Sequence, residues 1–501
     1  MKSPLSGPTV ALLAVLVLCS FLAGPAPAAD APERKPKYVF LFIGDGMGLP
    51  QISAAQYYLA AKEGTVGGNN LVMTSMPYQG ITTTYSAESP ITDSAAAATA
   101  MACGVKTYNA GLGVDDRKKP YRSIASLAKA KGMKVGIVTS VSLDHATPGA
   151  FYAHQESRRS YHEMGHELAK SGFDYFAGGG FLDPDGKKSK APQGNVVEAV
   201  KKAGYTVVAD RAGFEALGPK SGKVLAMNKR LPDEEAMPYA IDAKAPDVAL
   251  AEFTAKGIRL LDNPKGFFMM VEGGKIDWSC HANDAATTLA DLMALDAAVA
   301  EARTFAETHP KDTLIVVTGD HETGGLTVGF AGTKYENFFT VLDGQQTSFQ
   351  AFRDEVLAPF LAPHGAAARF EDVQPLITRH FGLKFAGDPK ADRLVLKDYE
   401  AAQLREAFQR SLVGEKEASK DEQGYLLYGG YDPLTVTVTH LLNQKAGLGW
   451  TTYSHTGVPV ATAAQGPGGR LFAGYYDNTD IFKKLAAAMG FDATPTPLAG
   501  N

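Results

Sequence analysis

Cysteine is scarce in this sequence, which has only Cys19, Cys103 and Cys280 among 501 residues. A small exported domain stabilised mainly by disulfides would carry many more, so a disulfide-built scaffold is excluded. The sequence leaves open whether Cys103 and Cys280 pair. Two buried reduced thiols are the simpler interpretation.

An excess of basic residues is also absent, because 49 Lys and Arg stand against 54 Asp and Glu, for a formal net charge of −5. Binding of a polyanion depends on a positive field, so nucleic acid is not expected as a specific partner. A small anion remains compatible with this balance, since a local metal site can overrule the net charge. The ordinary composition, 45% hydrophobic, excludes a disordered, collagen-like or coiled-coil chain.

No hydrophobic run is long enough to cross a bilayer. The apolar run near the start, Val10 to Ala23, is interrupted by Gly24 and Pro25 and is too short. A lysine before it and an Ala-Pro-Ala sequence after it are typical of a secretory signal, which we expect at residues 1–28. Residues 29–501 would then form the main domain of a periplasmic or secreted protein with no membrane anchor.

Short runs rich in Val, Ile and Phe alternate with Ala-rich helical stretches. Continuous apolarity of this kind is typical of strands that are buried on both faces. The alternation predicts an α/β protein, a three-layer α/β/α fold around a central, mostly parallel sheet. The expected strands are Tyr38 to Ile43, Gly132 to Ser140, Phe267 to Val271 and Thr313 to Thr318, and the expected helices include Ser94 to Cys103, Tyr121 to Ala130 and Ala282 to Glu307.

The segment from about 335 to 430 has a different character. Helix-period segments and charged stretches replace the buried strands, so we expect a cap-like helical insertion there. After it, Asp432-Pro433 predicts a helix that ends near Gly447, with an acidic cap, proline in the first helical position and glycine just past the end.

Polar residues follow the predicted buried strands. Asp45 comes after the first strand, Glu272 after the third and Asp320 after the fourth. Taken singly, Asp45 between two glycines is more typical of a turn, and the other two of helix caps. Ligands of open α/β sheets bind outside the carboxyl ends of the strands, however, so we expect these residues to converge on one rim.

Sorted by donor chemistry, the candidate metal ligands fall into three groups. Asp277 and His281 are four residues apart on a predicted helix and would project from one face, and His455 could add a distant third ligand. Two imidazoles and a carboxylate with an open position suit a catalytic zinc. A second mixed group of nitrogen and oxygen donors, Asp45, Asp320 and His321, suits zinc as well. A third group, Asp45, Thr147 and Glu272, offers only oxygen and suits magnesium.

A nucleophile and an anion-binding group are also present. Ser94 begins an Ala-rich helix and, as an isolated feature, would be its N-cap. Its functional interpretation is a hydroxyl held at a helix N-terminus and against a metal, where both effects favour the alkoxide. Arg158 and Arg159 could bind phosphate oxygens in a bidentate manner, although an arginine pair is usually surface charge.

Several separated motifs carry a family resemblance. They are Asp45-Gly46-Met47-Gly48, Thr92-Asp93-Ser94-Ala95, Gly104-Val105-Lys106-Thr107-Tyr108-Asn109, His145-Ala146-Thr147-Pro148, Glu272-Gly273-Gly274-Lys275-Ile276-Asp277-Trp278, Gly319-Asp320-His321-Glu322 and His455-Thr456-Gly457. Together they closely resemble the alkaline phosphatases, in order from about Lys37 to Gly329 and again near Tyr453.

The resemblance implies a phosphomonoesterase that releases inorganic phosphate through a phosphoserine at Ser94. Arg158 would hold the phosphate oxygens and Asp93 would position Arg158. The resemblance also implies two zinc ions and a magnesium ion per chain. The first zinc would activate the hydrolytic water, the second would hold the Ser94 alkoxide, and the three ions would use the three ligand groups given above.

The family varies at two positions beside the third metal, where this sequence has His145 and Trp278, as one branch does. An imidazole there could weaken magnesium binding or admit zinc or cobalt instead. Family members are commonly homodimers, and the sequence leaves a homodimer open.

Two other classes of function stay open. A related phosphodiesterase usually has threonine where Ser94 stands, and a sulfatase needs a cysteine or serine within an aldehyde-forming signature. A non-catalytic phosphate- or metal-binding protein would not need an activated nucleophile beside its ligands.

Overall fold

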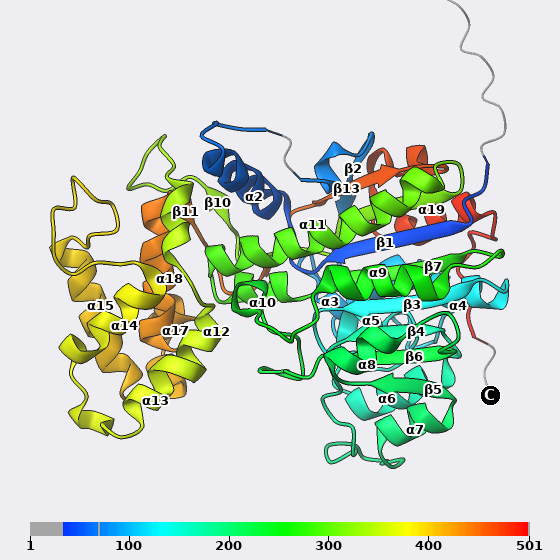
Figure 1. The fold of residues 1–501 in the computed structure, drawn as a ribbon, viewed down its shortest axis with the longest axis horizontal. Helices are drawn as coiled ribbons and strands as arrows, with labels where there is room; N and C mark the ends of the chain where they lie inside the picture. The colour runs from blue at the N-terminus through cyan, green and yellow to red at the C-terminus, as the bar shows by residue number, and fades with distance from the viewer. Residues whose placement is uncertain (1–33, 69–70, 499–501) are drawn as a thin grey trace, which may run out of the picture. The chain divides into compact units, whose positions relative to one another are not determined.

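A ten-stranded sheet forms the centre of the fold (Figure 1). The computed structural model describes residues 34–68 and 71–498, so the expected signal segment, residues 1–28, lies outside the described residues. The strand order is β14-β2-β13-β8-β1-β7-β3-β4-β6-β5, and of the described strands in this sheet only β13 runs antiparallel to its neighbours. The mostly parallel sheet predicted from the sequence is confirmed. The strands are β1 (Tyr38–Gly44), β2 (Tyr78–Thr83), β3 (Lys134–Thr139), β4 (Tyr175–Gly178), β5 (Tyr205–Val208), β6 (Lys223–Met227), β7 (Phe267–Gly273), β8 (Thr313–Gly319), β13 (Val460–Gln465) and β14 (Gly474–Asp477).

Helices cover both faces of the sheet. In β1, Phe40 and Phe42 join one hydrophobic cluster while Leu41 and Ile43 join another, and all four are fully buried. Because successive side chains of a strand point to opposite faces, a strand that is apolar throughout needs cover on both. The first cluster includes residues of α2 (Leu49–Lys62), α9 (Leu250–Leu261) and α11 (Ala285–Thr308), and the second includes residues of α3 (Ser94–Cys103), α4 (Ile124–Ala130), α6 (Tyr161–Lys170), α7 (Val196–Lys202) and α19 (Thr479–Met489). The α/β/α layering is therefore as expected.

The four strands expected from the sequence are β1, β3, β7 and β8, and they lie side by side at the centre of the sheet. The helix expected at Ala282 to Glu307 is α11, which starts three residues later. The preceding residues form a separate short helix, α10 (Lys275–His281), and Asp284 caps α11 by accepting a hydrogen bond from the Thr287 backbone N–H at 3.1 Å. Burial of Asp284 makes this cap independent of water.

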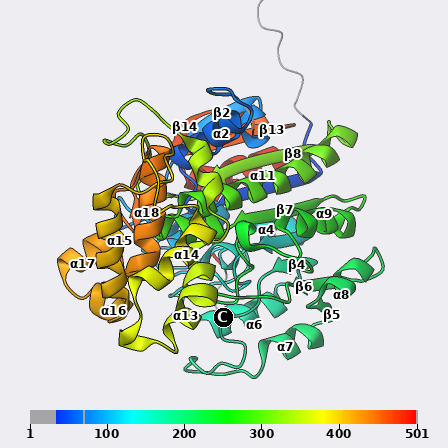
Figure 2. The same cartoon turned by 60° about the vertical axis from the view of Figure 1, so that its left-hand side comes forward.

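A group of helices lies beyond the carboxyl ends of the parallel strands (Figures 1 and 2). Within 335–430 the described residues add no strand to the sheet, and α15 (Asp398–Ser411) packs against α18 (Pro433–Ala446). The buried Lys445 Nζ lies 2.7 Å from Glu400 Oε2 and joins these two helices. The other α-helices of the region are α12 (Phe349–Ala351), α13 (Ala358–Leu361), α14 (Phe370–Phe381), α16 (Glu415–Ala418) and α17 (Glu422–Tyr428).

The predicted limits of α18 are confirmed, since Asp432 is its N-cap and Gly447, with φ of 86°, ends it. Cys103 and Cys280 are both buried free thiols, which agrees with the simpler of the two interpretations. In residues 34–68 and 71–498, no helix combines the length and the apolar character needed to cross a membrane.

Candidate metal and phosphate site

The polar residues expected on one rim of the sheet do converge there. Asp45 follows β1 and Asp320 follows β8. Glu272 is the penultimate residue of β7, so it lies within the strand rather than after it. All three carboxylates are buried, with at most 1% of each residue exposed. Strands β8, β1 and β7 are adjacent and in parallel register, with Ile43 opposite both Glu272 and Thr318. Neighbouring strand ends therefore carry the side chains to the same place.

A glycine makes the close approach of these strand ends possible. Gly46 has φ of 72°, and a Cβ on it would lie 2.8 Å from Asp277 Cα. Its backbone N–H donates a 3.0 Å hydrogen bond to Asp320 Oδ1. The Asp45-Gly46 pair thus does more than form a turn, because it docks β1 against the ligand-bearing segments on either side.

The first candidate metal centre, site A, consists of Asp277, His281 and His455. His281 Nε2 lies 3.3 Å from Asp277 Oδ2 and 3.1 Å from His455 Nε2, and His455 Nε2 lies 3.6 Å from Asp277 Oδ1. The first two residues lie one turn apart on α10, as their spacing predicted. His455 arrives through a small antiparallel sheet of β12 (His455–Thr456) and β9 (Glu322–Thr323), in which it pairs with Thr323.

The second candidate centre, site B, consists of Asp45, Asp320 and His321. His321 Nε2 lies 3.4 Å from Asp45 Oδ1 and 3.3 Å from Asp320 Oδ2. Sites A and B adjoin, because the rings of His321 and His455 stack with their centroids 3.7 Å apart. The two clusters are close enough to act on one phosphoryl group.

The third candidate centre, site C, brings together Asp45, His145 and Glu272. Thr147, the neutral ligand expected there, places Oγ1 3.4 Å from Asp45 Oδ2. His145, which the sequence predicted beside the third metal, thus offers a ligand atom within the same candidate cluster. The Trp278 ring lies 5.9 Å from that of His145.

Each imidazole of sites A and B is oriented by a partner on its far nitrogen. His281 Nδ1 lies 2.6 Å from the Tyr453 carbonyl oxygen, and His455 Nδ1 lies 2.8 Å from that of Thr92. His321 Nδ1 lies 3.2 Å from the Thr323 hydroxyl. Since a carbonyl oxygen can only accept, Nδ1 of His281 and of His455 carries a proton, which leaves Nε2 as the nitrogen that would bind a metal ion.

The charges of the site call for a cation. Burial, followed by repulsion from Asp320 and Asp277, raises the pKa of Asp45 well above its ordinary value. Burial and the charge of Asp277 raise the pKa of Asp320 in the same way. Among the described residues Asp320 Oδ2 has no hydrogen-bond donor. Buried carboxylates this close are stable when ionised only if a positive charge lies between them, so the residues present fit divalent metal ions.

Imidazoles dominate the electrostatics of Asp277. Its burial disfavours ionisation, but the adjacent rings of His281, His455 and His321 outweigh that effect and hold its pKa well below the usual range. Conversely, the Asp277 carboxylate overcomes the burial of His281 and raises the pKa of this histidine to about 8. Site A therefore combines a carboxylate that stays ionised with imidazole nitrogens that can bind a metal ion once they are unprotonated.

Ser94 lies against site B. Its Oγ is 3.3 Å from His321 Nε2 and 3.5 Å from Asp45 Oδ1. Ser94 is the first residue of α3 and is not its N-cap, because Asp93 accepts the capping hydrogen bond from the Ala96 backbone N–H at 3.0 Å. The cap interpretation of Ser94 is thus wrong. The Ser94 hydroxyl does not make the capping hydrogen bond, and it lies at the positive end of the helix dipole.

One arginine of the expected pair reaches the site. Arg158 Nη1 donates to Asp93 Oδ2 at 3.1 Å, and Nη2 lies 3.0 Å from His145 Nε2. Burial and the positive charge of Arg158 lower the pKa of His145 to about 3, so His145 is neutral. Arg159 is exposed and keeps the interpretation of surface charge.

Two contributors were missed by reasoning from the sequence. The Thr323 hydroxyl donates to Asp277 Oδ1 at 2.6 Å and contacts His321, so it joins sites A and B. Its position two residues after His321 was an available signal. Asn283, two residues beyond His281, lies in the left-handed region with φ of 50°, and no pattern in the sequence indicated this.

The site combines two clusters of imidazole and carboxylate side chains with a serine hydroxyl and a guanidinium. A metal-dependent hydrolase of anionic esters requires this set of groups. Comparison with known proteins identifies the family. The family model described as alkaline phosphatase matches residues 36–491.

Relatives and solved structures agree with this match. Alkaline phosphatase 3 of Bacillus subtilis is 30% identical over 496 residues, which cover 96% of this chain and 96% of the relative. The structure of a cold-active alkaline phosphatase from the psychrophile Shewanella sp. has a TM-score of 0.72 and 31% identity, over 90% of this chain and 99% of that one. A histidine-to-glutamate variant of the alkaline phosphatase of the Antarctic bacterium TAB5, with Mg bound in its M3 site, has a TM-score of 0.62 and 25% identity, over 92% and 100% of the two chains.

The chain belongs to the alkaline phosphatase family. It is a metal-dependent phosphatase that hydrolyses phosphomonoesters.

Proposed function

We propose that this phosphatase works through a phosphoserine at Ser94. The observation that carries the proposal is the position of Ser94 Oγ, within 3.5 Å of both Asp45 and His321 and at the N-terminus of α3. A hydroxyl in this place lies at the positive end of the helix dipole and would lie next to a cation held by site B, and both would favour its deprotonation.

We propose zinc at site A and at site B, one ion in each, because each offers imidazole nitrogen with carboxylate oxygen. For site C we propose magnesium, with zinc or cobalt as the alternatives that the imidazole of His145 would favour. The magnesium found in the M3 site of the TAB5 variant supports magnesium as one occupant of a third site in this family. When bound, such ions would polarise the phosphate oxygens and lower the pKa of water that is to attack.

The residues of this chain divide the remaining work. Arg158, held by Asp93, would bind two phosphate oxygens and fix the phosphorus in line with Ser94 Oγ. Oγ then forms a bond to phosphorus as the ester P–O bond breaks, and the alcohol leaves with the proton that the serine lost. In the second half, a water oxygen bonds to phosphorus and the P–Oγ bond breaks. Ser94 regains a proton and inorganic phosphate is released.

We also propose that residues 1–28 are a secretory signal, that residues 29–501 form the catalytic domain, and that about 335–430 is an insertion in it. The enzyme would act in the periplasm or outside the cell on small phosphomonoesters. Two copies of the chain could form a homodimer, as is common in the family. Support for export comes from the apolar run and the small residues that follow it.

The phosphoserine is tested by quenching the purified enzyme with acid during turnover of a labelled phosphomonoester and mapping the labelled peptide. We expect label on Ser94 and about two zinc ions per chain by elemental analysis. In Ser94→Ala the label and most turnover should vanish while the metal content stays. Label on another residue, or normal turnover by Ser94→Ala, would refute the assignment. Hydrolysis of diesters only would instead favour a related phosphodiesterase.

A further inference from the structure

Asn283 occupies an unusual backbone position directly after α10. Its φ of 50° lies in the left-handed region, which few residues other than glycine adopt readily, asparagine being one of them. The residue is only 3% exposed. Its backbone N–H donates to the Cys280 carbonyl at 2.9 Å, so the chain turns sharply just after His281.

The side-chain amide of Asn283 joins two segments that are far apart in the sequence. Nδ2 donates to the carbonyl oxygen of Cys280 at 2.9 Å and to that of Thr452 at 3.0 Å. These two carbonyls can only accept, so they fix which end of the amide is nitrogen. Cys280 is the neighbour of His281, and Thr452 precedes His455 by three residues, so one amide spans the two segments that carry imidazoles of site A.

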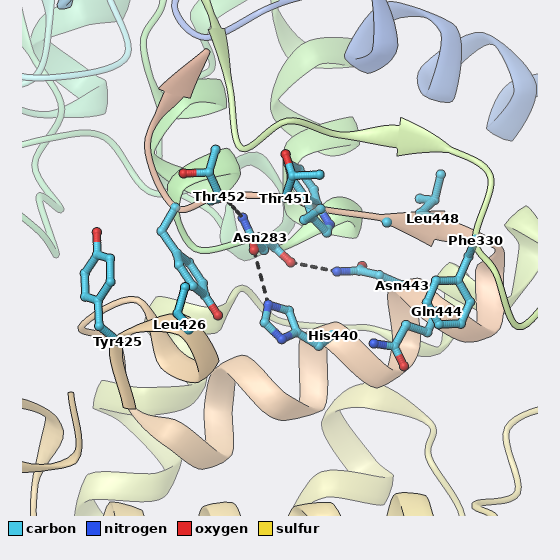
Figure 3. Close-up of a pocket in the computed structure, with 13 residues that line it drawn as sticks. Asn283, Phe330, Tyr425, Leu426, His440, Asn443, Gln444, Leu448, Thr451 and Thr452 are labelled. Atoms are coloured by element: carbon cyan, nitrogen blue, oxygen red, sulfur yellow. Dashed lines mark hydrogen bonds between the residues drawn. The ribbon is translucent and has the colours of Figure 1, made fainter. Parts of the chain in front are cut away.

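Helix α18 holds Asn283 from the other side. His440 Nε2 lies 3.2 Å from Asn283 Oδ1, and because the amide oxygen can only accept, Nε2 carries the proton. Asn443 Nδ2 donates to the Asn283 carbonyl at 2.7 Å. Asn443 Oδ1 accepts from the Ala285 backbone N–H at 3.3 Å. Figure 3 shows the contacts of Asn283 with Thr452, His440 and Asn443, with Asn283 between α18 below and the Thr451–Thr452 segment above.

The surroundings make these hydrogen bonds necessary. A cavity of about 250 Å³ lies beside the network, and Asn283, His440, Asn443 and Thr452 all line it. Because Asn283 lines this cavity, its hydrogen bonds with polar partners contribute to fixing the position of its amide. The segment that Asn283 holds at Thr452 continues to Tyr453, whose carbonyl accepts from His281 Nδ1 at 2.6 Å.

We propose that Asn283 is a positioning residue for site A, setting the separation and orientation of His281 and His455. Through His440 and Asn443, α18 anchors it. Helix α18 would thereby contribute to metal binding without supplying a ligand. This inference rests on the proposed function, in which site A holds a metal ion.

The test is the zinc affinity of Asn283→Gly, measured by competition with a chelator of known affinity. Glycine accepts the positive φ, so this variant removes the amide without straining the backbone. Loss of a partner that orients a ligand typically weakens metal binding by about 10- to 100-fold, and we expect a loss of this size for one of two zinc ions. Asn283→Asp, of the same shape, sets an oxygen against two carbonyls and should lose at least as much. Raised zinc should restore activity to both.

Reference variants identify the ion and separate the hypotheses. His455→Ala marks loss at site A, and Asp320→Ala marks loss at site B. Asn228→Ala is the matched control, since among the described residues the buried side-chain amide of Asn228 bonds only to the Val248 backbone. Its zinc affinity should equal that of the unmodified enzyme. Unchanged zinc affinity in Asn283→Gly, or an equal loss at both sites, would overturn the inference. Full zinc retention by His455→Ala would instead overturn the assignment of site A.

Discussion

The Thr323 hydroxyl donates a 2.6 Å hydrogen bond to Asp277 Oδ1. The same oxygen lies 3.2 Å from His321 Nδ1. If Nδ1 donates to it, protons are ordered from His321 through Thr323 to Asp277, which leaves Nε2 of His321 unprotonated in site B. A residue that is no ligand thus couples the orientation of one ligand in site A to that of one in site B.

Thr323→Val should lower kcat by about 10- to 100-fold and weaken zinc binding, because valine keeps the shape of threonine but cannot orient either ligand. Steady-state kinetics at saturating zinc and chelator competition would measure both effects. Thr462→Val is the control, since that buried hydroxyl contacts Thr82 and Thr318 inside the sheet. Equal zinc affinities for the two variants would contradict a role for Thr323.

Asp93 has two separable tasks. Oδ1 caps α3 and Oδ2 accepts from Arg158. Asp93→Asn can keep the cap oxygen but presents an N–H to the guanidinium, so we expect KM to rise by about 10-fold, the value of one charge-assisted hydrogen bond. Asp93→Ala should show the same rise and also lose about 1 kcal/mol of stability with the cap.

Kinetics and thermal unfolding distinguish these outcomes. An Asp93→Asn variant with an unchanged KM would show that Arg158 reaches the phosphate without this partner. A stability of Asp93→Ala equal to that of Asp93→Asn would show that the cap contributes nothing to the folded state.

Substitution at His145 should change which ion site C prefers. His145→Asp replaces a neutral nitrogen donor by an anionic oxygen, and hard octahedral ions such as magnesium prefer oxygen. We expect the magnesium content of the variant to rise and its affinity for zinc or cobalt at that site to fall. Elemental analysis after dialysis against defined metal mixtures would measure this. An unchanged metal preference would mean that Glu272, Asp45 and Thr147 alone select the ion.

Stability in acid should depend on His440. Burial lowers the pKa of this histidine to about 4, whereas its value in an unfolded chain is about 6.5. Because the folded-state pKa is depressed, the neutral ring contributes fully above pH 6.5 and its contribution is lost as the pH falls towards 4. Unfolding in that window therefore takes up about one additional proton.

His440→Gln should remove this proton uptake. Urea unfolding of the chelated protein at several pH values would measure it, with the other histidines common to both proteins. The pH dependence of the unfolding free energy between pH 6.5 and 4 should be shallower in the variant. Parallel curves for the two proteins would show that His440 titrates normally in the fold.

Local patterns in the sequence were enough for the central strands and for the ends of α18. Continuous apolarity identifies β1, β7 and β8 because a strand buried on both faces has no polar side. The cap Asp432 and the terminal Gly447 identify the helix because they satisfy its own backbone groups. These signals come from residues a few positions apart, which a sequence displays directly.

The sequence also grouped the candidate ligands of sites A and B, since donor chemistry and the spacing of Asp277 and His281 already brought them together. His455, 134 positions beyond His321, joined them by resemblance and a sorting of donor types. The sequence alone could not show how it arrives there.

Tertiary structure decided the rest. It made Asp93 the cap and left the Ser94 hydroxyl available, brought His145 into site C, and kept Cys103 and Cys280 apart as buried thiols. It also put Thr323 between sites A and B and tied Asn283 to α18. Each of these outcomes depends on partners from distant strands and helices, whose approach is set by burial of the whole sheet and by the demand that buried polar groups find partners. A local pattern contains no record of those partners.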